Sequence, residues 1–303
     1  MRQFPINKNV LILHFTVLIW GFTGVLGELI SISALHLVWY RVLIAALSLF
    51  VYFIMMGKSV YVCKERLVQF LMVGGLVGLH WVLFFHAIKI ANVSVTLVTL
   101  SSVTLFTSIL EPIINRKKIA LSDVGVGLVI VFGIYLIFKF EFQYVWGILC
   151  GLSCAVCASI FSILNARMVK HTSPTIITFY EMLGAGFWVS VIMLLAGDFN
   201  VRMWPQGSDW AYLLLLGVLC TAVAYVLGVA VMKELTAFTV ALTTNMEPVY
   251  GIILAVLIFG HKETMSVGFY VGAVIVLGAV FIYPYIKTYI EKKERRLINR
   301  KLH

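Results

Sequence analysis

Charge is scarce in this chain. Asp, Glu, Lys and Arg together make up 12% of its 303 residues, while 62% are hydrophobic. In a soluble domain about a quarter of the residues are charged, so this composition excludes an ordinary soluble protein. The mean hydropathy of +1.03 fits a chain whose helices face lipid. We therefore expect an all-α membrane protein that crosses the bilayer many times.

Cysteines and catalytic motifs are also too few to indicate chemistry. The five cysteines give no disulfide framework, and Cys154 and Cys157 lie within an apolar helical run, which argues against a zinc or redox site. The sequence contains no HExxH or GxSxG motif, no cluster of aspartates and no ATP-binding motif. We therefore expect no cofactor and no metal, and neither an enzyme nor a primary pump.

Ten apolar runs are long enough to cross a bilayer as helices, which takes about 20 residues each. The first follows Lys8 and is too long for the core of a signal peptide, so we expect it to be retained. The connections are short, and the longest, residues 197–209, has the composition of a surface loop. The predicted spans are roughly 10–31, 35–56, 66–88, 92–113, 119–139, 143–167, 174–196, 209–232, 236–260 and 264–286.

Lysine and arginine are distributed unevenly between the two sides of these spans. With both termini on one side, that side carries 18 of the 23 and the other side carries four, while Arg41 lies within a span. Because positive residues favour the cytoplasmic side, we predict that both termini are cytoplasmic and that the protein lies in the cell (cytoplasmic) membrane. Seven of the 18 follow Pro284 and are interpreted as cations near anionic lipid. The net charge of +10 therefore does not indicate nucleic acid.

An internal repeat with an offset of 145 residues relates the two halves of the chain. Gly127 and Gly133 correspond to Gly272 and Gly278 at this offset. Each half has five spans, an odd number, so the halves must have opposite topology. Inverted repeats with a substrate site at their interface are typical of secondary transporters. We predict repeats at 1–141 and 142–286 and a basic cytoplasmic tail at 287–303.

The ninth predicted span carries polar residues near its middle. Glu247 is costly at membrane depth, so a functional site is the default hypothesis. Pro248 cannot donate a backbone hydrogen bond and leaves the carbonyl of Thr244 without its helical partner. Val103 occupies the equivalent place in the first half, so we expect a mid-helix break in the second half only. A proline kink beside a hydrogen-bonded glutamate is the alternative.

Aromatic and polar residues on other spans complete a candidate site. Concave sites with apolar walls and a few polar groups are the usual small-ligand environment. Helix packing is the alternative for each aromatic, and a hydroxyl can satisfy its own helix carbonyl. The predicted substrate-binding residues are Trp20, His80, Trp81, Ser101, Ser102, Tyr225, Thr244, Asn245, Glu247 and Tyr250.

Three further charged residues are expected to have structural roles. Arg41 needs an anion or carbonyl partner, and Glu28 and Glu247 are the candidates. Glu181 lies near the cytoplasmic end of the seventh span, from which its side chain can reach water. Glu111 is close to Arg116 and Lys117 in sequence, so a surface ion pair is expected there.

In the order and spacing of loose motifs, the chain resembles the ten-helix EamA type of the drug/metabolite transporter (DMT) superfamily. The motifs are Trp20-Gly21, Arg41, Ala87-Ile88-Lys89, Glu247-Pro248-Val249, Phe259-Gly260 and the glycines of the fifth and tenth spans. The family often has an acidic residue directly after the glycine that ends the ninth span. Here His261 stands at that place and Glu263 follows two residues later.

The resemblance implies a secondary transporter, often an exporter of amino acids or other small metabolites. It also implies a central cavity lined by the first, third, fourth, sixth, eighth and ninth spans. Burial disfavours the charged form of a carboxyl, so Glu247 is a candidate to carry a coupling proton. The competing functions are an antiporter of a nucleotide sugar, a sugar phosphate or a lipid-linked substrate, and an intramembrane enzyme.

Overall fold

The computed structural model describes residues 8–116 and 121–302, and among these every regular element is a helix. The helices of the first half are α1 (Lys8–Leu29), α2 (Ala34–Met55), α3 (Lys64–Ile90), α4 (Val93–Leu100), α5 (Val103–Ile114) and α6 (Leu121–Phe140). Those of the second half are α7 (Val145–Met168), α8 (Pro174–Leu195), α9 (Asp209–Leu214), α10 (Ala224–Val231), α11 (Ala237–Thr244), α12 (Met246–Phe259) and α13 (Val267–Leu302). Short helical turns are η1 (Phe142–Tyr144), η2 (Val201–Met203) and η4 (Gly260–Glu263), and η3 (Leu215–Val223) is a π-helix.

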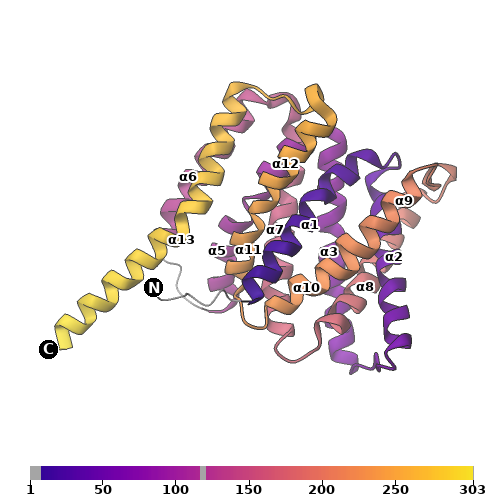
Figure 1. The fold of residues 1–303 in the computed structure, drawn as a ribbon, viewed down its shortest axis with the longest axis horizontal. Coiled ribbons are helices and arrows are strands. Elements are labelled where there is room, and N and C mark those ends of the chain that lie inside the picture. Colours follow the sequence, from indigo (N-terminus) through magenta and orange to yellow (C-terminus); the bar gives the residue numbers. More distant parts are fainter. Residues whose placement is uncertain (1–7, 117–120, 303) are drawn as a thin grey trace.

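Eight helical stretches in the described residues are long and apolar enough to cross a membrane. They coincide with eight of the ten predicted spans. The fifth and tenth predicted spans correspond to α6 and α13, whose apolar parts are shorter. These two helices lie side by side at one edge of the bundle, and the last turns of α13 project beyond it (Figure 1). The basic side chains of the predicted tail lie outside the described residues, although the helix backbone continues to Leu302.

Glycine brings α6 and α13 into close contact. A Cβ atom added at Gly133 would lie 3.0 Å from the carbonyl oxygen of Gly272, and one added at Gly272 would lie 2.7 Å from that of Gly133. Small residues that let two helix backbones approach are a common feature of membrane helix pairs. The glycines that revealed the sequence repeat therefore also join its two halves.

Mid-helix breaks occur in both halves, which corrects the expectation of a single break. The first separates α4 from α5 at Ser101 and Ser102, and the second separates α11 from α12 at Asn245. No proline causes the first break. Instead the hydroxyls of Ser101 and Ser102 donate to the carbonyls of Val98 and Thr99, at 2.5 and 2.7 Å. Such local hydrogen bonds compete with the regular helical pattern.

The eighth predicted span contains a third irregularity, the nine-residue π-helix η3 between α9 and α10. The hydroxyl of Thr221 donates to the carbonyl of Leu216, five residues earlier, at 2.7 Å. Stretches of π-helix inside α-helices are frequent at functional sites because they shift side chains out of the regular register. Here the widened turn carries Thr221 toward α2.

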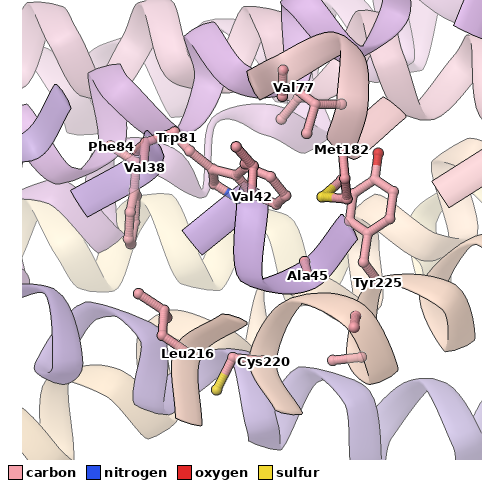
Figure 2. Packing of buried hydrophobic residues seen from close by; sticks show 14 of the residues in the cluster. Val38, Val42, Ala45, Val77, Trp81, Phe84, Met182, Leu216, Cys220 and Tyr225 are labelled. Atoms are coloured by element: carbon pink, nitrogen blue, oxygen red, sulfur yellow. The ribbon is translucent and has the colours of Figure 1, made fainter. Parts of the chain in front are cut away.

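Figure 2 shows part of the core, where residues of α2, α3, α8, η3 and α10 pack together, and α1 adds further buried side chains to the same cluster. Large hydrophobic side chains are also exposed on the outside of the bundle, where lipid would surround them. Examples are Leu47, Leu128, Leu194, Leu195, Ile253 and Leu257.

Candidate functional site

A cavity lies in the middle of the bundle, between the two halves of the chain. It encloses about 820 Å³ of space free of protein atoms, part of it open to solvent. Apolar walls with a few polar groups are the usual environment of a small ligand. Its lining includes residues from all six spans that the resemblance implied, and α2 adds Arg41. The residues are Trp20, Thr23, Arg41, His80, Trp81, Phe84, Leu100, Val103, Ala158, Phe161, Ser162, Asn165, Tyr225, Gly228, Val229, Met232, Val240, Ala241, Thr244 and Glu247.

Aromatic side chains form much of the cavity wall. Trp81 and Tyr225 meet edge to face, with ring centroids 5.8 Å apart, and Phe161 lies 6.2 Å from Tyr225. Trp20 reaches the cavity across Gly228, where an added Cβ would lie 2.8 Å from the indole ring. A residue larger than glycine at position 228 would therefore push this indole away.

Arg41 is 1% exposed and lies at the cavity wall. Its Nε donates to the Thr221 hydroxyl at 2.6 Å, and its guanidinium lies over the Trp81 ring, 4.0 Å from the ring centroid. Its Nη1 has no hydrogen-bond partner among the described residues. The expected partners Glu28 and Glu247 are replaced by this hydroxyl and this ring. Arg41 is therefore a rigidly held cation with an unused donor.

Glu247 is 7% exposed and also lines the cavity. No hydrogen bond to its carboxylate is formed by the described residues, and no ion pair within 4.0 Å joins it to Arg41. The cavity thus has one cation and one carboxylate, each with unused hydrogen-bonding capacity. The alternative of a glutamate fully satisfied by hydroxyls does not agree with this geometry.

Glu181 is completely buried, which corrects the expectation that it reaches water. One carboxylate oxygen accepts hydrogen bonds from the Tyr225 hydroxyl at 2.8 Å and from the Asn165 amide at 3.3 Å. Both donors line the cavity, so Glu181 positions them from behind. The close approach of α8 to α3 at Gly74 causes this burial, since a Cβ added at Gly74 would lie 2.3 Å from the Glu181 carbonyl oxygen.

His80 lines the cavity, but its ring is already engaged. Nδ1 lies 3.0 Å from the carbonyl oxygen of Cys154, and the ring stacks on Phe84 with a centroid distance of 6.4 Å. One ring nitrogen therefore has a structural partner, and the other is the one that a solute can use.

Four predicted site residues lie outside the cavity lining. Ser101 and Ser102 bond their own helix carbonyls, as described above. Asn245 donates to the carbonyl of Ala241 at 3.0 Å, which the broken backbone pattern leaves available. Tyr250 packs against α1, where a Cβ added at Gly21 would lie 2.8 Å from the Tyr250 Cβ. Side chains at these four positions maintain the breaks and the packing of the helices that surround the cavity.

Two carboxylates cap helices that belong to the opposite half of the chain. Glu111 accepts a hydrogen bond from the Phe238 amide at 3.1 Å, and no ion pair joins it to Arg116 among the described residues. Its other expected partner, Lys117, lies outside the described residues.

Glu263 is 2% exposed, and its carboxylate accepts hydrogen bonds from the amides of Val93 and Ser94, at 3.1 and 2.9 Å. The contacts of Glu111 and of Glu263 could not be predicted from spacing along the chain, because each joins residues more than 100 positions apart.

Comparison with known proteins identifies the family of this bundle. The model of the EamA-like transporter family matches the chain twice, over residues 7–139 and 145–283. The chain belongs to the EamA-like transporter family. The duplicated match agrees with the internal repeat, and the family indicates a multi-pass membrane transporter rather than an enzyme.

Relatives of this EamA-like chain are named as transporters. The uncharacterized transporter YoaV of Bacillus subtilis (strain 168) is 23% identical over 282 residues, which span 88% of this chain and 92% of YoaV. The uncharacterized transporter YetK of the same organism is 26% identical over 137 residues, 45% of this chain and 39% of YetK. A solved crystal structure superposes with a TM-score of 0.68 at 18% identity, over 92% of this chain and 98% of the other. That likeness supports the fold alone.

Proposed function

We propose that this EamA-like protein is a secondary transporter that exports a small metabolite such as an amino acid across the cytoplasmic membrane. The observation that carries the proposal is the pair of unused charged groups, Arg41 and Glu247, on one aromatic-walled cavity. A carboxylate of the solute would bind the free Nη1 of Arg41, because a charge-assisted hydrogen bond is among the strongest polar contacts. An ammonium group would face Glu247, and the solute's side chain would lie against Trp20 and Tyr225.

Alternating access would follow from two inverted five-helix repeats, with α6 and α13 as the fifth and tenth spans. In this arrangement the repeats comprise residues 1–141 and 142–286, and both termini are cytoplasmic. The proton is the proposed coupling ion, with Glu247 as its carrier. A carboxyl that faces the cavity can bind a proton from one side of the membrane and release it to the other.

A nucleotide sugar, a sugar phosphate or a lipid-linked substrate fits this cavity less well. Such anions carry two or more negative charges and would call for several cations. Among the lining residues Arg41 is the cation, His80 has one ring nitrogen engaged, and Glu247 adds a negative charge. The balance of charge therefore favours a solute with a single carboxylate.

An untargeted comparison of metabolites tests this proposal. Cells with and without expression of the protein are compared for metabolites inside the cells and in the medium. Export predicts that one class of carboxylate-bearing metabolite falls inside the cells and rises in the medium. The inactive control is the Arg41→Gln variant at equal membrane abundance. An unchanged profile would contradict export, while a change that the Arg41→Gln variant reproduces would contradict a binding role for Arg41.

The proposed topology predicts where reporter fusions will be active. Fusions after Lys118 and after Arg167 should report the cytoplasm, and fusions near Gln206 should report the outside, because the positive-inside bias orients the spans. Paired reporters, one active only in each compartment, provide the measurement. Opposite signals at these sites would contradict the inverted arrangement.

The aromatic wall predicts a loss of transport without a loss of folding. Trp20→Ala and Tyr225→Ala each remove a ring from the cavity, and each should lower kcat/KM by about tenfold or more, as truncated hot-spot residues do at other binding sites. Transport into vesicles of matched protein content is the measurement. Trp188→Ala, at a residue outside the cavity lining, is the control. Normal transport by both variants would assign Trp20 and Tyr225 to packing.

A further inference from the structure

The two broken helices lie against each other in opposite directions. The α4–α5 helix belongs to the first half and runs alongside α11–α12 of the second half, with α4 against α12 and α5 against α11. We call the contact between these two broken helices the seam. Residues on both sides of the seam line the cavity: Leu100 and Val103 from the first half, and Ala241 and Thr244 from the second. The seam is therefore a wall of the cavity at which the two halves of the protein meet.

A carboxylate closes each end of this seam. At one end Glu263, the last residue of the turn η4 that follows α12, accepts hydrogen bonds from the first amides of α4, at Val93 and Ser94. At the other end Glu111, in the last turn of α5, accepts a hydrogen bond from the Phe238 amide at the start of α11. The repeat offset of 145 residues relates Val93 to Phe238, so the same place in each half is capped by the opposite half.

The middle of the seam is joined differently. The Asn245 amide donates to the Thr104 hydroxyl, and that hydroxyl donates to the Ala241 carbonyl at 3.3 Å. All three residues are buried beside the breaks in the two helices. The seam thus has a neutral connection at its centre and a charged connection at each end.

The hydrogen bonds between carboxylate and amides at the two ends of the seam are strong, but water can replace them. The first amides of a helix have no partner within the helix, and the helix dipole favours a negative charge at that position. When the seam separates at one end, water can take over both the amides and the carboxylate. The central hydrogen bonds lie halfway along the two broken helices, far from the helix ends, so breaking them would leave polar groups unpaired. Separation at one end with the centre held therefore costs less than separation of the whole seam.

We propose that Glu263 and Glu111 are the two gating residues of this transporter, each of which holds the cavity closed toward one side of the membrane. Opening toward the outside breaks the contact of Glu263 with α4, and opening toward the cytoplasm breaks the contact of Glu111 with α11. Thr104, Asn245 and Ala241 form the pivot between them. This inference rests on the proposed function only for alternating access and for the assignment of sides, and it does not depend on the identity of the substrate.

Cysteine accessibility tests the gates without a substrate. Ser162 lines the cavity and makes no hydrogen bond to another described residue, so Ser162→Cys on a background without the five native cysteines is the reporter. A membrane-impermeant, positively charged methanethiosulfonate is applied to intact cells or to inside-out vesicles, and the rate of labelling is measured. Elution as a single folded species in detergent is checked for every variant.

Removing one gate should expose the cavity to one side only. Glu263→Ala should raise the labelling rate from the outside by about tenfold, and Glu111→Ala should raise it from the cytoplasmic side by a similar factor, as expected for the loss of a charged hydrogen bond. Glu263→Gln keeps one of the two acceptor oxygens and should give an intermediate rate. The glutamine variant also keeps the test decisive where the alanine variant does not fold.

The matched control is Glu141→Ala. Glu141 accepts a hydrogen bond from the Ser266 amide ahead of α13 at 2.8 Å, so it is the same kind of cap, but on α6 and α13, which contribute nothing to the cavity lining. Its labelling should not change. The proposal is overturned if Glu263→Ala and Glu111→Ala act in the same direction, if neither changes the rate, or if the control matches them. Loss of transport with unchanged labelling would likewise overturn the gates, while opposite labelling in a protein that exports nothing would reject only the proposed function.

Discussion

Glu247→Gln is expected to separate substrate exchange from the response to a proton gradient. The variant should still exchange substrate on one side of a vesicle for substrate on the other. An imposed pH gradient, which accelerates transport by the unaltered protein, should have no effect on it. Both activities are measured in the same reconstituted vesicles, so protein content and orientation are matched.

The reason lies in what glutamine keeps and what it loses. Its amide oxygen still accepts a hydrogen bond, so a bound solute retains a polar partner at the cavity wall. It has no proton to gain or release, so it cannot carry one between the two sides. We expect KM for exchange to rise by no more than about tenfold, the equivalent of one hydrogen bond to a charged group.

Glu181→Gln is the matched control, because Glu181 is the other buried carboxyl beside the cavity. It lies behind Tyr225 and Asn165 and does not line the cavity itself. This variant should keep its response to the pH gradient. If Glu247→Gln keeps the response, Glu247 is not the proton carrier. If Glu181→Gln loses it instead, the role belongs to Glu181. Loss of both activities by a folded Glu247→Gln protein would show that the carboxylate is needed for binding or structure, without proving coupling.

Arg41→Gln should abolish transport of a carboxylate-bearing solute. We expect kcat/KM to fall on the order of 100-fold, because removing one partner of a buried charged contact leaves the other charge unpaired. Initial rates of uptake into inside-out vesicles, over a range of solute concentrations, are the measurement. Binding of the solute to purified protein, followed by the quenching of tryptophan fluorescence, gives the affinity separately.

Two conservative variants separate the binding role of Arg41 from a structural one. Arg41→Lys keeps the charge but loses the planar guanidinium and its forked N–H donors. Its affinity for the solute should therefore lie between those of Arg41→Gln and the unaltered protein. Thr221→Val removes the acceptor that holds Nε and leaves the guanidinium in place. It should weaken binding by about tenfold, the value of one hydrogen bond to a charged group. If Arg41→Gln lowers thermal stability but transports at the normal rate per folded molecule, the residue is structural.

The sequence by itself determined the class of the protein and the order of its helices. Low charge and long apolar runs predicted a polytopic helical bundle, and eight of the predicted spans are confirmed as candidate membrane helices. These features could be predicted because they depend on local composition over about 20 residues. The glycine spacing also predicted the duplication that the family comparison confirms.

Only the tertiary structure decided which polar residues face the cavity. Arg41, Glu181, Glu111 and Glu263 all have partners from distant parts of the chain, and no spacing along one helix predicts such a contact. Ser101 and Asn245 have the polarity expected of site residues, yet their side chains satisfy carbonyls that the helix breaks release. A polar side chain inside a membrane must find a partner, but the sequence does not say whether that partner is its own backbone, another helix or a solute. The packing of the helices decides among them.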